Sequence, residues 1–307
     1  MWRRAMVLAL AVATGAAGQQ KQVRKAPPVR KTPVVQIPDT VEVKTGLVYA
    51  TYGERRLRLD LYLPKAGAGP FPAVVYIHGG GWSEGNPLAF RRQAIHMATK
   101  GFVGACIEYR LSGEARYPAA VHDAKAAVRW LRANAAQYRV QGNRIGAAGG
   151  STGGHLAALL GTTHQIKALE GNGGHPEQSS RVQAVAVFNP ALDLVELANK
   201  AAAAKLRWDP VSVFLGVSRS ANPRFYAEAS PITHVSPGAA PFLLAHGTED
   251  RTVPYHQSVA MLNKLKQAGV RAELYTVRGA DHGFFQGILW YEEALKKMEE
   301  FFTRTLK

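Results

Sequence analysis

The 307-residue sequence has a single cysteine and few acidic side chains. One cysteine excludes an intramolecular disulfide, so packing alone must hold the fold together. Cys106 lies in the apolar run at residues 102–107, which predicts a buried strand position and argues against a reactive thiol. Hydrophobic residues make up 47% of the chain, which is enough for one large core in a single α/β domain.

Acidic residues are scarce beside basic ones, because 22 Asp and Glu stand against 38 Lys and Arg and give a formal net charge of +16. Seven of the basic residues precede Asp39, the first acidic one. The others are scattered and no nucleic-acid-binding motif accompanies them, which argues against a nucleic-acid partner. Two interpretations of the basic surface stay open: solubility, or attraction to an anionic polysaccharide or a membrane surface.

The N-terminal hydrophobic run, residues 5–17, is too short to span a bilayer comfortably. It follows a basic start and ends in small residues, so we predict a signal peptide over residues 1–18. The mature protein would then be secreted or periplasmic, with no stable membrane insertion after cleavage; an uncleaved anchor is the alternative. Residues 19–40 are basic and proline-rich, which predicts an extended linker ahead of a domain at residues 41–307.

A G-x-S-x-G pattern at residues 149–153 lies between a strand-like run at 144–148 and a helix-like run at 155–160. Glycines two residues before and after Ser151 remove the Cβ atoms that would clash in a sharp strand-to-helix turn. Such a turn exposes the serine hydroxyl beside the free N–H groups of a helix start. We therefore predict Ser151 as a nucleophile and the Thr152 N–H as an oxyanion donor.

The same chemistry needs further oxyanion donors, a base and an acid. A glycine run at residues 79–81 follows the strand at 73–77, so the N–H groups of Gly80 and Gly81 can approach a substrate oxygen. Asp250 follows the next-to-last predicted strand, and His282 follows the last one. The chain order Ser, Asp, His is that of α/β-hydrolases.

Other side chains compete for some of these roles. Asp193, after the strand at 182–188, and Asp281, next to the base, are alternative acids. Trp82 and Phe284 are predicted to line the substrate pocket because each adjoins a catalytic position. The other histidines near these motifs are expected to be structural: His78 in the oxyanion loop, His155 one helical turn after Ser151, and His246 at a strand end. No metal-ligand spacing recurs, so neither a metal nor a cofactor is expected.

The alternation of short apolar strands with helical segments predicts a parallel sheet buried on both faces. The expected strands cover residues 73–77, 102–108, 144–148, 182–188, 241–246 and 272–277, after an antiparallel hairpin of 41–51 and 55–63. A helix is expected over 118–138. Residues 191–235 interrupt the alternation with an alanine-rich helix at 197–206, and we interpret them as a small cap over the site.

The motifs together resemble the HGGG branch of the α/β-hydrolase superfamily, which includes hormone-sensitive-lipase-like esterases and bacterial feruloyl and acetyl-xylan esterases. The likeness covers residue 41 to the C-terminus and is carried by LDLYLP at 59–64, HGGGW at 78–82, YPAAVHD at 117–123 and GSTGGHLA at 150–157. It implies an eight-stranded, mostly parallel sheet with helices on both faces. It also implies a serine carboxylic ester hydrolase that forms an acyl-enzyme.

The resemblance and the predicted export together favour acetyl or feruloyl esters of plant polysaccharide, or generic short-chain esters, as substrates. Two alternatives remain from the sequence. A serine peptidase similar to the prolyl oligopeptidase family would share the catalytic domain, although such proteins usually carry a large N-terminal propeller. A hydrolase-like binding protein without catalysis would not need the complete set of Ser151, Asp250 and His282.

Overall fold

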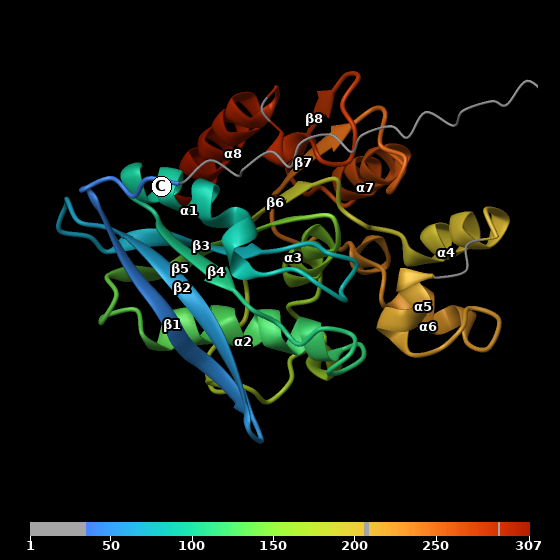
Figure 1. Cartoon of the computed structure of the whole chain (residues 1–307), viewed down its shortest axis with the longest axis horizontal. Coiled ribbons are helices and arrows are strands. Elements are labelled where there is room, and N and C mark those ends of the chain that lie inside the picture. The colour runs from blue at the N-terminus through green and yellow to red at the C-terminus, as the bar shows by residue number, and fades with distance from the viewer. Residues whose placement is uncertain (1–34, 206–208, 288) are drawn as a thin grey trace, which may run out of the picture. The chain divides into compact units, whose positions relative to one another are not determined.

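The computed structural model describes residues 35–205, 209–287 and 289–307. The predicted signal peptide and residues 19–34 of the predicted linker lie outside them. One eight-stranded sheet runs through the domain in the order β1-β2-β4-β3-β5-β6-β7-β8 (Figure 1). The strands are β1 (Val41–Tyr52), β2 (Arg55–Pro64), β3 (Phe71–Ile77), β4 (Val103–Ile107), β5 (Val140–Gly150), β6 (Ala184–Phe188), β7 (Phe242–Gly247) and β8 (Ala272–Val277).

The strand directions follow the predicted pattern. β1 and β2 form the antiparallel hairpin, which turns at Gly53 with φ +59°. β2 is also antiparallel to β4, and the strands from β4 through β3, β5, β6 and β7 to β8 are all parallel to their neighbours. The six apolar runs therefore form β3 to β8, and the α/β fold is confirmed. Cys106 is a buried residue of β4.

Helices cover both faces of the sheet. They are α1 (Arg91–Thr99), α2 (Ala119–Ala133), α3 (Thr152–Thr162), α4 (Leu194–Ala203), α5 (Pro210–Leu215), α6 (Pro223–Glu228), α7 (His256–Gln267) and α8 (Tyr291–Leu306). Short 3₁₀ turns occur at η1 (Pro87–Phe90), η2 (Lys167–Leu169), η3 (Pro231–His234) and η4 (Phe284–Gln286). Figure 1 shows α1 and α8 above the sheet and α2 below it.

The alternation of β3 explains the two layers. Val75 and Ile77 pack in one core cluster with α2, α3 and α7, whereas Val74 and Tyr76 pack in a second cluster with α1 and α8. Successive side chains of a strand point to opposite faces, so a strand between two helical layers must be apolar at every position. Burial of both faces leaves the loops at the strand ends as the place for polar chemistry.

The predicted boundaries around residue 138 were wrong. The helix expected over 118–138 ends at Ala133. Asn134 follows as its C-cap, with the backbone N–H and the side-chain amide both donating to the Trp130 carbonyl (3.0 and 2.9 Å), and the Tyr138 ring stacks on the Trp130 ring (5.3 Å between centroids). β5 consequently begins at Val140, four residues earlier than predicted.

The segment at residues 191–235 leaves the sheet after β6 and returns before β7. It contains α4, α5, α6 and η3, and Figure 1 shows the three α-helices grouped to the right of the sheet. The predicted helix at 197–206 is displaced, because Asp193 caps the N-terminus of α4 by accepting from the Glu196 N–H (3.0 Å). Residues 206–208, including Trp208, lie outside the described part of the chain. We refer to 191–235 as the cap segment.

No helix in residues 35–205, 209–287 or 289–307 has the length and apolarity that a bilayer crossing requires.

The close packing of β5 against α8 can be tested at Gly146. A Cβ at this position would lie 2.7 Å from the Phe302 ring and 3.0 Å from Leu306. We expect Gly146→Ala to lower the free energy of unfolding by about 1–3 kcal/mol, because the buried ring must shift. Gly113→Ala is the control, since its Cβ would meet nothing within 4 Å. Chemical denaturation measures both, and equal stability of the two variants would contradict this packing.

Candidate active site

Ser151 is the single residue between the end of β5 and the start of α3, and its backbone angles are φ 55° and ψ −121°. A non-glycine residue rarely adopts positive φ, and such strain persists only where the surroundings enforce it. The neighbouring glycines are required by close contacts: a Cβ at Gly149 would lie 2.3 Å from the Gly153 carbonyl oxygen, and one at Gly153 would lie 2.1 Å from that of Ile77. The serine hydroxyl is thereby presented at the edge of the sheet.

The three residues predicted for nucleophile, base and acid meet at this edge. His282 Nε2 lies 2.9 Å from Ser151 Oγ, and His282 Nδ1 lies 2.6 Å from Asp250 Oδ2. Ser151, Asp250 and His282 follow three different parallel strands, and the carboxyl ends of parallel strands share one edge of a sheet. The imidazole can therefore take a proton from the hydroxyl while the carboxylate holds its other nitrogen.

The surroundings of Asp250 keep its carboxylate ionised. The side chain is buried, yet Oδ1 accepts hydrogen bonds from the Thr252 and Val253 N–H groups at 2.8 and 2.9 Å. Burial raises the pKa of Asp250, but the hydrogen bonds from His246 and His282 outweigh it and hold the pKa well below its ordinary value. A permanently charged acceptor at Nδ1 leaves Nε2 of His282 free to accept the serine proton.

The competing acids have other partners. Asp193 is the N-cap of α4, and Asp281 Oδ1 accepts from the Gly283 N–H at 3.0 Å. Asp250, by contrast, is paired with the His282 ring. Of the three candidate carboxylates in the described residues, Asp250 is therefore the one that the geometry favours as the acid.

The glycine loop after β3 faces the same site. Gly80 has φ +121°, and a Cβ there would lie 2.2 Å from the Glu84 carbonyl oxygen, so the tight turn admits only glycine. The Trp82 N–H donates to Thr152 Oγ1 (3.4 Å), which ties the loop to the start of α3. The Thr152 side chain thus helps to position the loop. Gly80, Gly81 and Thr152 all line the cavity that contains Ser151.

This catalytic cavity has a volume of about 1060 Å³. Besides the residues above, it is lined by the cap segment through Leu197, Ala201 and Val211. Its polar lining includes Lys200 and Arg251, and the Lys200 ammonium donates to the Thr252 carbonyl at 3.1 Å. The cap segment therefore forms one wall of the space in front of the nucleophile. No group of three or more His, Cys, Asp or Glu side chains within the described residues could hold a metal ion.

Comparison with known proteins places this site in a family. The BD-FAE family model matches residues 59–265, which is more than half of the chain. The chain belongs to the BD-FAE family. This is a family of α/β-hydrolase esterases, in agreement with the resemblance to the HGGG branch.

Curated relatives of this BD-FAE chain include two proteins of Mycobacterium tuberculosis. A probable carboxylic ester hydrolase, LipM, is 31% identical over 74% of this chain and 52% of its own length. Esterase LipC is 31% identical over 70% of this chain and 53% of its own length. The chain thus spans about half the length of these curated relatives.

Solved structures match over more of their length. A truncated carbohydrate esterase from gut microbiota has a TM-score of 0.76 and 30% identity, covering 87% of this chain and 97% of the other. Est2 of Thermogutta terrifontis with bound propionate has a TM-score of 0.71 and 33% identity, covering 87% of this chain and 94% of the other. Both are named as esterases.

The two aromatic residues predicted to line the pocket of this BD-FAE member differ in outcome. Trp82 does line the cavity, although it is only 2% exposed and stacks on Phe214 of the cap segment (4.5 Å between centroids). The prediction for Phe284 was wrong, because this side chain is 1% exposed and is not among the described residues that line the cavity. The 3₁₀ turn η4 directs the next residue, Phe285, into the cavity instead. A sequence pattern cannot specify which of two adjacent aromatics such a turn presents.

Asn189 is a site residue that sequence reasoning missed. It follows β6 with φ 44°, is fully buried, and accepts from the Gly247 N–H (3.3 Å). Its side-chain amide also donates to the His282 carbonyl. It therefore links the ends of β6 and β7 to the loop of the base. The only signal in the sequence was an asparagine at a strand end, which is equally typical of a simple turn.

The structural roles expected for three histidines are confirmed. His78 stacks on Tyr109 in the oxyanion loop, and His246 is buried at the end of β7. His155 is buried beneath that loop, where its Nδ1 accepts from Trp82 Nε1 (3.2 Å) and its Nε2 donates to the Ala229 carbonyl (2.8 Å). Burial lowers the pKa of His155 to about 4, so it joins the loop to the cap segment as a neutral ring.

The neutral state of His155 predicts a pH dependence of stability. Its pKa is near 6.5 in the unfolded chain and lowered to about 4 in the fold, so the unfolded chain binds the proton first. The contribution of the neutral His155 ring to the free energy of unfolding is fully present above pH 6.5. It decreases by up to about 3 kcal/mol as the pH falls toward 4. We therefore expect the stability difference between the wild type and His155→Gln to shrink over this range in chemical denaturation.

The control is Leu156→Ala, which changes a buried non-titrating residue of α3, so its difference from the wild type should stay nearly constant over the same range. A pH-independent difference for His155→Gln would contradict the buried neutral ring.

Proposed function

We propose that this chain is a serine carboxylic ester hydrolase that acts through an acyl-enzyme. One observation carries the proposal: the His282 ring bridges Ser151 Oγ (2.9 Å) and Asp250 Oδ2 (2.6 Å) beside the glycine loop. Membership of an esterase family supports it, as do the names of the relatives. Because the curated relatives are about twice as long, the activity of the whole protein remains part of the proposal.

The geometry suggests each step. His282 Nε2 takes the proton from Ser151 as Oγ attacks the ester carbonyl, and Asp250 stabilises the charged ring. The N–H groups of Gly80, Gly81 and Thr152 receive the developing oxyanion, where loss of one donor commonly costs about 2.7–4 kcal/mol of barrier. His282 then protonates the leaving alcohol. A water molecule, deprotonated by the same ring, attacks the acyl-enzyme and releases the acid with Ser151 restored.

For the substrate, we propose short acyl esters of a carbohydrate alcohol, with acetyl or feruloyl groups on plant polysaccharide as the leading cases. Support comes from the carbohydrate esterase neighbour and from the Est2 structures named with bound propionate and butyrate. Phe285 stands on the nucleophile side of the cavity, and its ring is so close to Gly150 that a Cβ there would lie 2.3 Å away. It leaves limited room beside the serine. Export through residues 1–18 stays a prediction.

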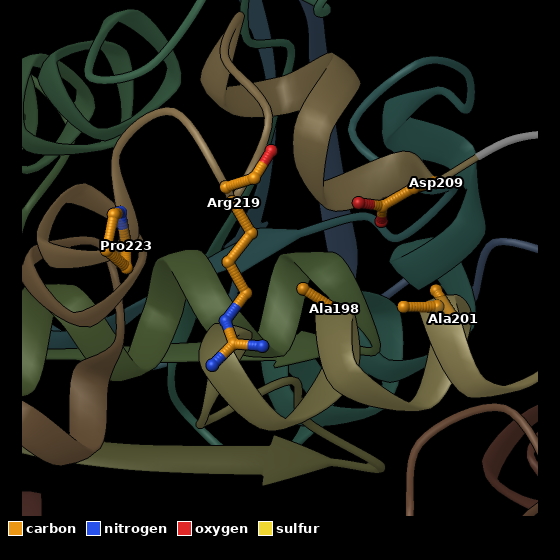
Figure 2. Close-up of a pocket in the computed structure, with 7 residues that line it drawn as sticks. Ala198, Ala201, Asp209, Arg219 and Pro223 are labelled. Atoms are coloured by element: carbon orange, nitrogen blue, oxygen red, sulfur yellow. The ribbon is translucent and has the colours of Figure 1, made fainter.

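A second cavity in the cap segment offers room for the alcohol part. It has a volume of about 520 Å³ and shares Ala201 and Asp209 with the catalytic cavity, so the two adjoin. Figure 2 shows the Arg219 side chain extending toward α4, which carries Ala198 and Ala201. Arg219 Nε is buried without a hydrogen-bond partner in the described residues. Arginine, aspartate and serine side chains are suited to sugar hydroxyls, and these three types are all present here.

Ser151→Ala tests the reaction. We expect kcat for nitrophenyl acetate to fall about 10⁴–10⁶-fold, because no other group can form the acyl-enzyme. A fluorophosphonate should label the wild type once per chain and leave Ser151→Ala unlabelled, as read by intact-protein mass spectrometry. Ser179→Ala, at an exposed serine remote from the motifs, should label like the wild type.

Absence of labelling and turnover in the wild type would favour a binding protein. Faster cleavage of a peptide amide than of any ester would favour the peptidase alternative.

Arg219→Ala tests the alcohol side. We expect KM for an acetylated xylo-oligosaccharide to rise about 3- to 10-fold, the effect of losing one hydrogen bond, with nitrophenyl acetate unaffected. Arg224→Ala removes an exposed arginine of the neighbouring helix α6 and serves as the control. If both substrates respond equally to Arg219→Ala, the second cavity does not select the alcohol.

A further inference from the structure

A second histidine lies against the carboxylate of Asp250. His246, near the end of β7, is completely buried, and its Nε2 lies 3.2 Å from Asp250 Oδ2 and 3.0 Å from the Val253 carbonyl oxygen. Its Nδ1 lies 2.7 Å from the hydroxyl of Ser258 on α7. The mechanism above uses neither His246 nor Ser258, and neither residue lines the catalytic cavity.

The partners define the hydrogen positions on this ring. Both groups that face Nε2 are acceptors, a carboxylate and a carbonyl, so Nε2 carries the hydrogen and shares it between them. Nδ1 then accepts, and the Ser258 hydroxyl donates to it. One tautomer of His246, with its hydrogen on Nε2, therefore satisfies all three partners. The serine on α7 selects that tautomer from the side away from the active site.

Asp250 is consequently held by four donors. The Thr252 and Val253 N–H groups bind Oδ1, while His282 and His246 share Oδ2. Val253 is bonded twice, because its N–H donates to Asp250 and its carbonyl accepts from His246. The loop and the carboxylate thus form a closed unit in which rotation of the carboxylate would break several bonds at once.

We propose that His246, held by Ser258, is a positioning residue for the hydrolysis: it fixes the Asp250 carboxylate and shares the charge on Oδ2. The inference rests on the proposed function, since it takes Ser151, His282 and Asp250 as the reacting set. His246 acts through Asp250 and does not touch the substrate. The arrangement resembles the outer partners of metal ligands, which orient a working group from behind.

Two consequences follow for a variant without this donor. The carboxylate gains freedom to rotate, so His282 spends less time directed at Ser151 and kcat falls while KM is unchanged. The charge on Oδ2 is also no longer shared, so it attracts the protonated form of His282 more strongly. Because that form cannot act as a base, the acid limb of the activity profile moves to higher pH.

Other titratable groups near the pair stay the same in the variants. Tyr255 meets the His246 ring edge-on (5.8 Å between centroids), and its hydroxyl is paired with Thr276 (2.7 Å). Asp281 and Glu249 adjoin the two loops, and Glu84, Lys200 and Arg251 line the cavity that His282 faces. Their effect on the acid limb is common to all the proteins compared, so a shift reports the change at residue 246.

The experiment compares His246→Leu, His246→Gln and Ser258→Ala with the wild type, using nitrophenyl acetate at a series of pH values. Active sites are counted by fluorophosphonate titration, so kcat refers to folded enzyme alone. We expect His246→Leu to lose about 10- to 100-fold in kcat, with KM unchanged and the acid limb shifted upward. His246→Gln should recover most of the loss, since its amide can donate to Asp250 and accept from Ser258. Ser258→Ala should give a smaller loss.

Leu265→Ala is the matched control, because Leu265 is fully buried on the same helix as Ser258 and is not one of the four groups described above that bind the Asp250 carboxylate. It should lower Tm yet leave kcat per titrated site and the acid limb unchanged. The inference is overturned if kcat and the acid limb of His246→Leu equal those of the wild type. It is also overturned if Leu265→Ala shifts the acid limb by as much as His246→Leu does. If His246→Leu fails to fold, a Ser258→Ala profile identical to the wild type does the same. A wild type without turnover or labelling overturns the proposed function, and the inference with it.

Discussion

The turn at Ser151 is the constraint on which the site depends. Its positive φ is tolerated because α3 lies so close to β3 and β5 that Gly149 and Gly153 have no space for a side chain. This approach puts the hydroxyl, the first N–H of α3 and the glycine loop in one cavity. Strain of this kind is maintained by the packing of the whole sheet. The core therefore contributes to chemistry by holding one backbone conformation that an isolated segment would not keep.

Around that turn, buried polar groups set the geometry. Asp250 is almost inaccessible, and it is charged because four donors surround it. Asn189 connects two strand ends to the loop of the base, and His155 connects the oxyanion loop to the cap segment. In a low-dielectric interior each unsatisfied partner would be costly, so such networks favour one arrangement over its neighbours. The network thereby fixes the positions of Ser151, His282 and Asp250 relative to one another.

The cap segment shapes the space in which a substrate would bind, whereas the catalytic residues lie at the edge of the sheet. The hydroxyl, imidazole and carboxylate are suited to many esters, whereas the cap segment lines the second cavity and forms one wall of the catalytic cavity. Trp82 joins these parts, since its ring stacks on Phe214 and its indole N–H reaches His155. Changes in the cap segment can thus alter substrate choice while the sheet and its catalytic edge are retained.

By itself the sequence determined the strands of the sheet and the strand-to-helix turn at Ser151, because apolar periodicity and glycine patterns are local. It also predicted Ser151, Asp250 and His282 as nucleophile, acid and base, because the chain order of their motifs is distinctive. It could not determine where the helix after residue 118 ends, nor that Phe285 and not Phe284 faces the cavity. The roles of Asn189, His246 and Ser258 were likewise decided only by the tertiary structure. The role of Asn189 depends on partners far away in the chain, because a hydrogen bond between two distant strand ends leaves no periodic trace in either one.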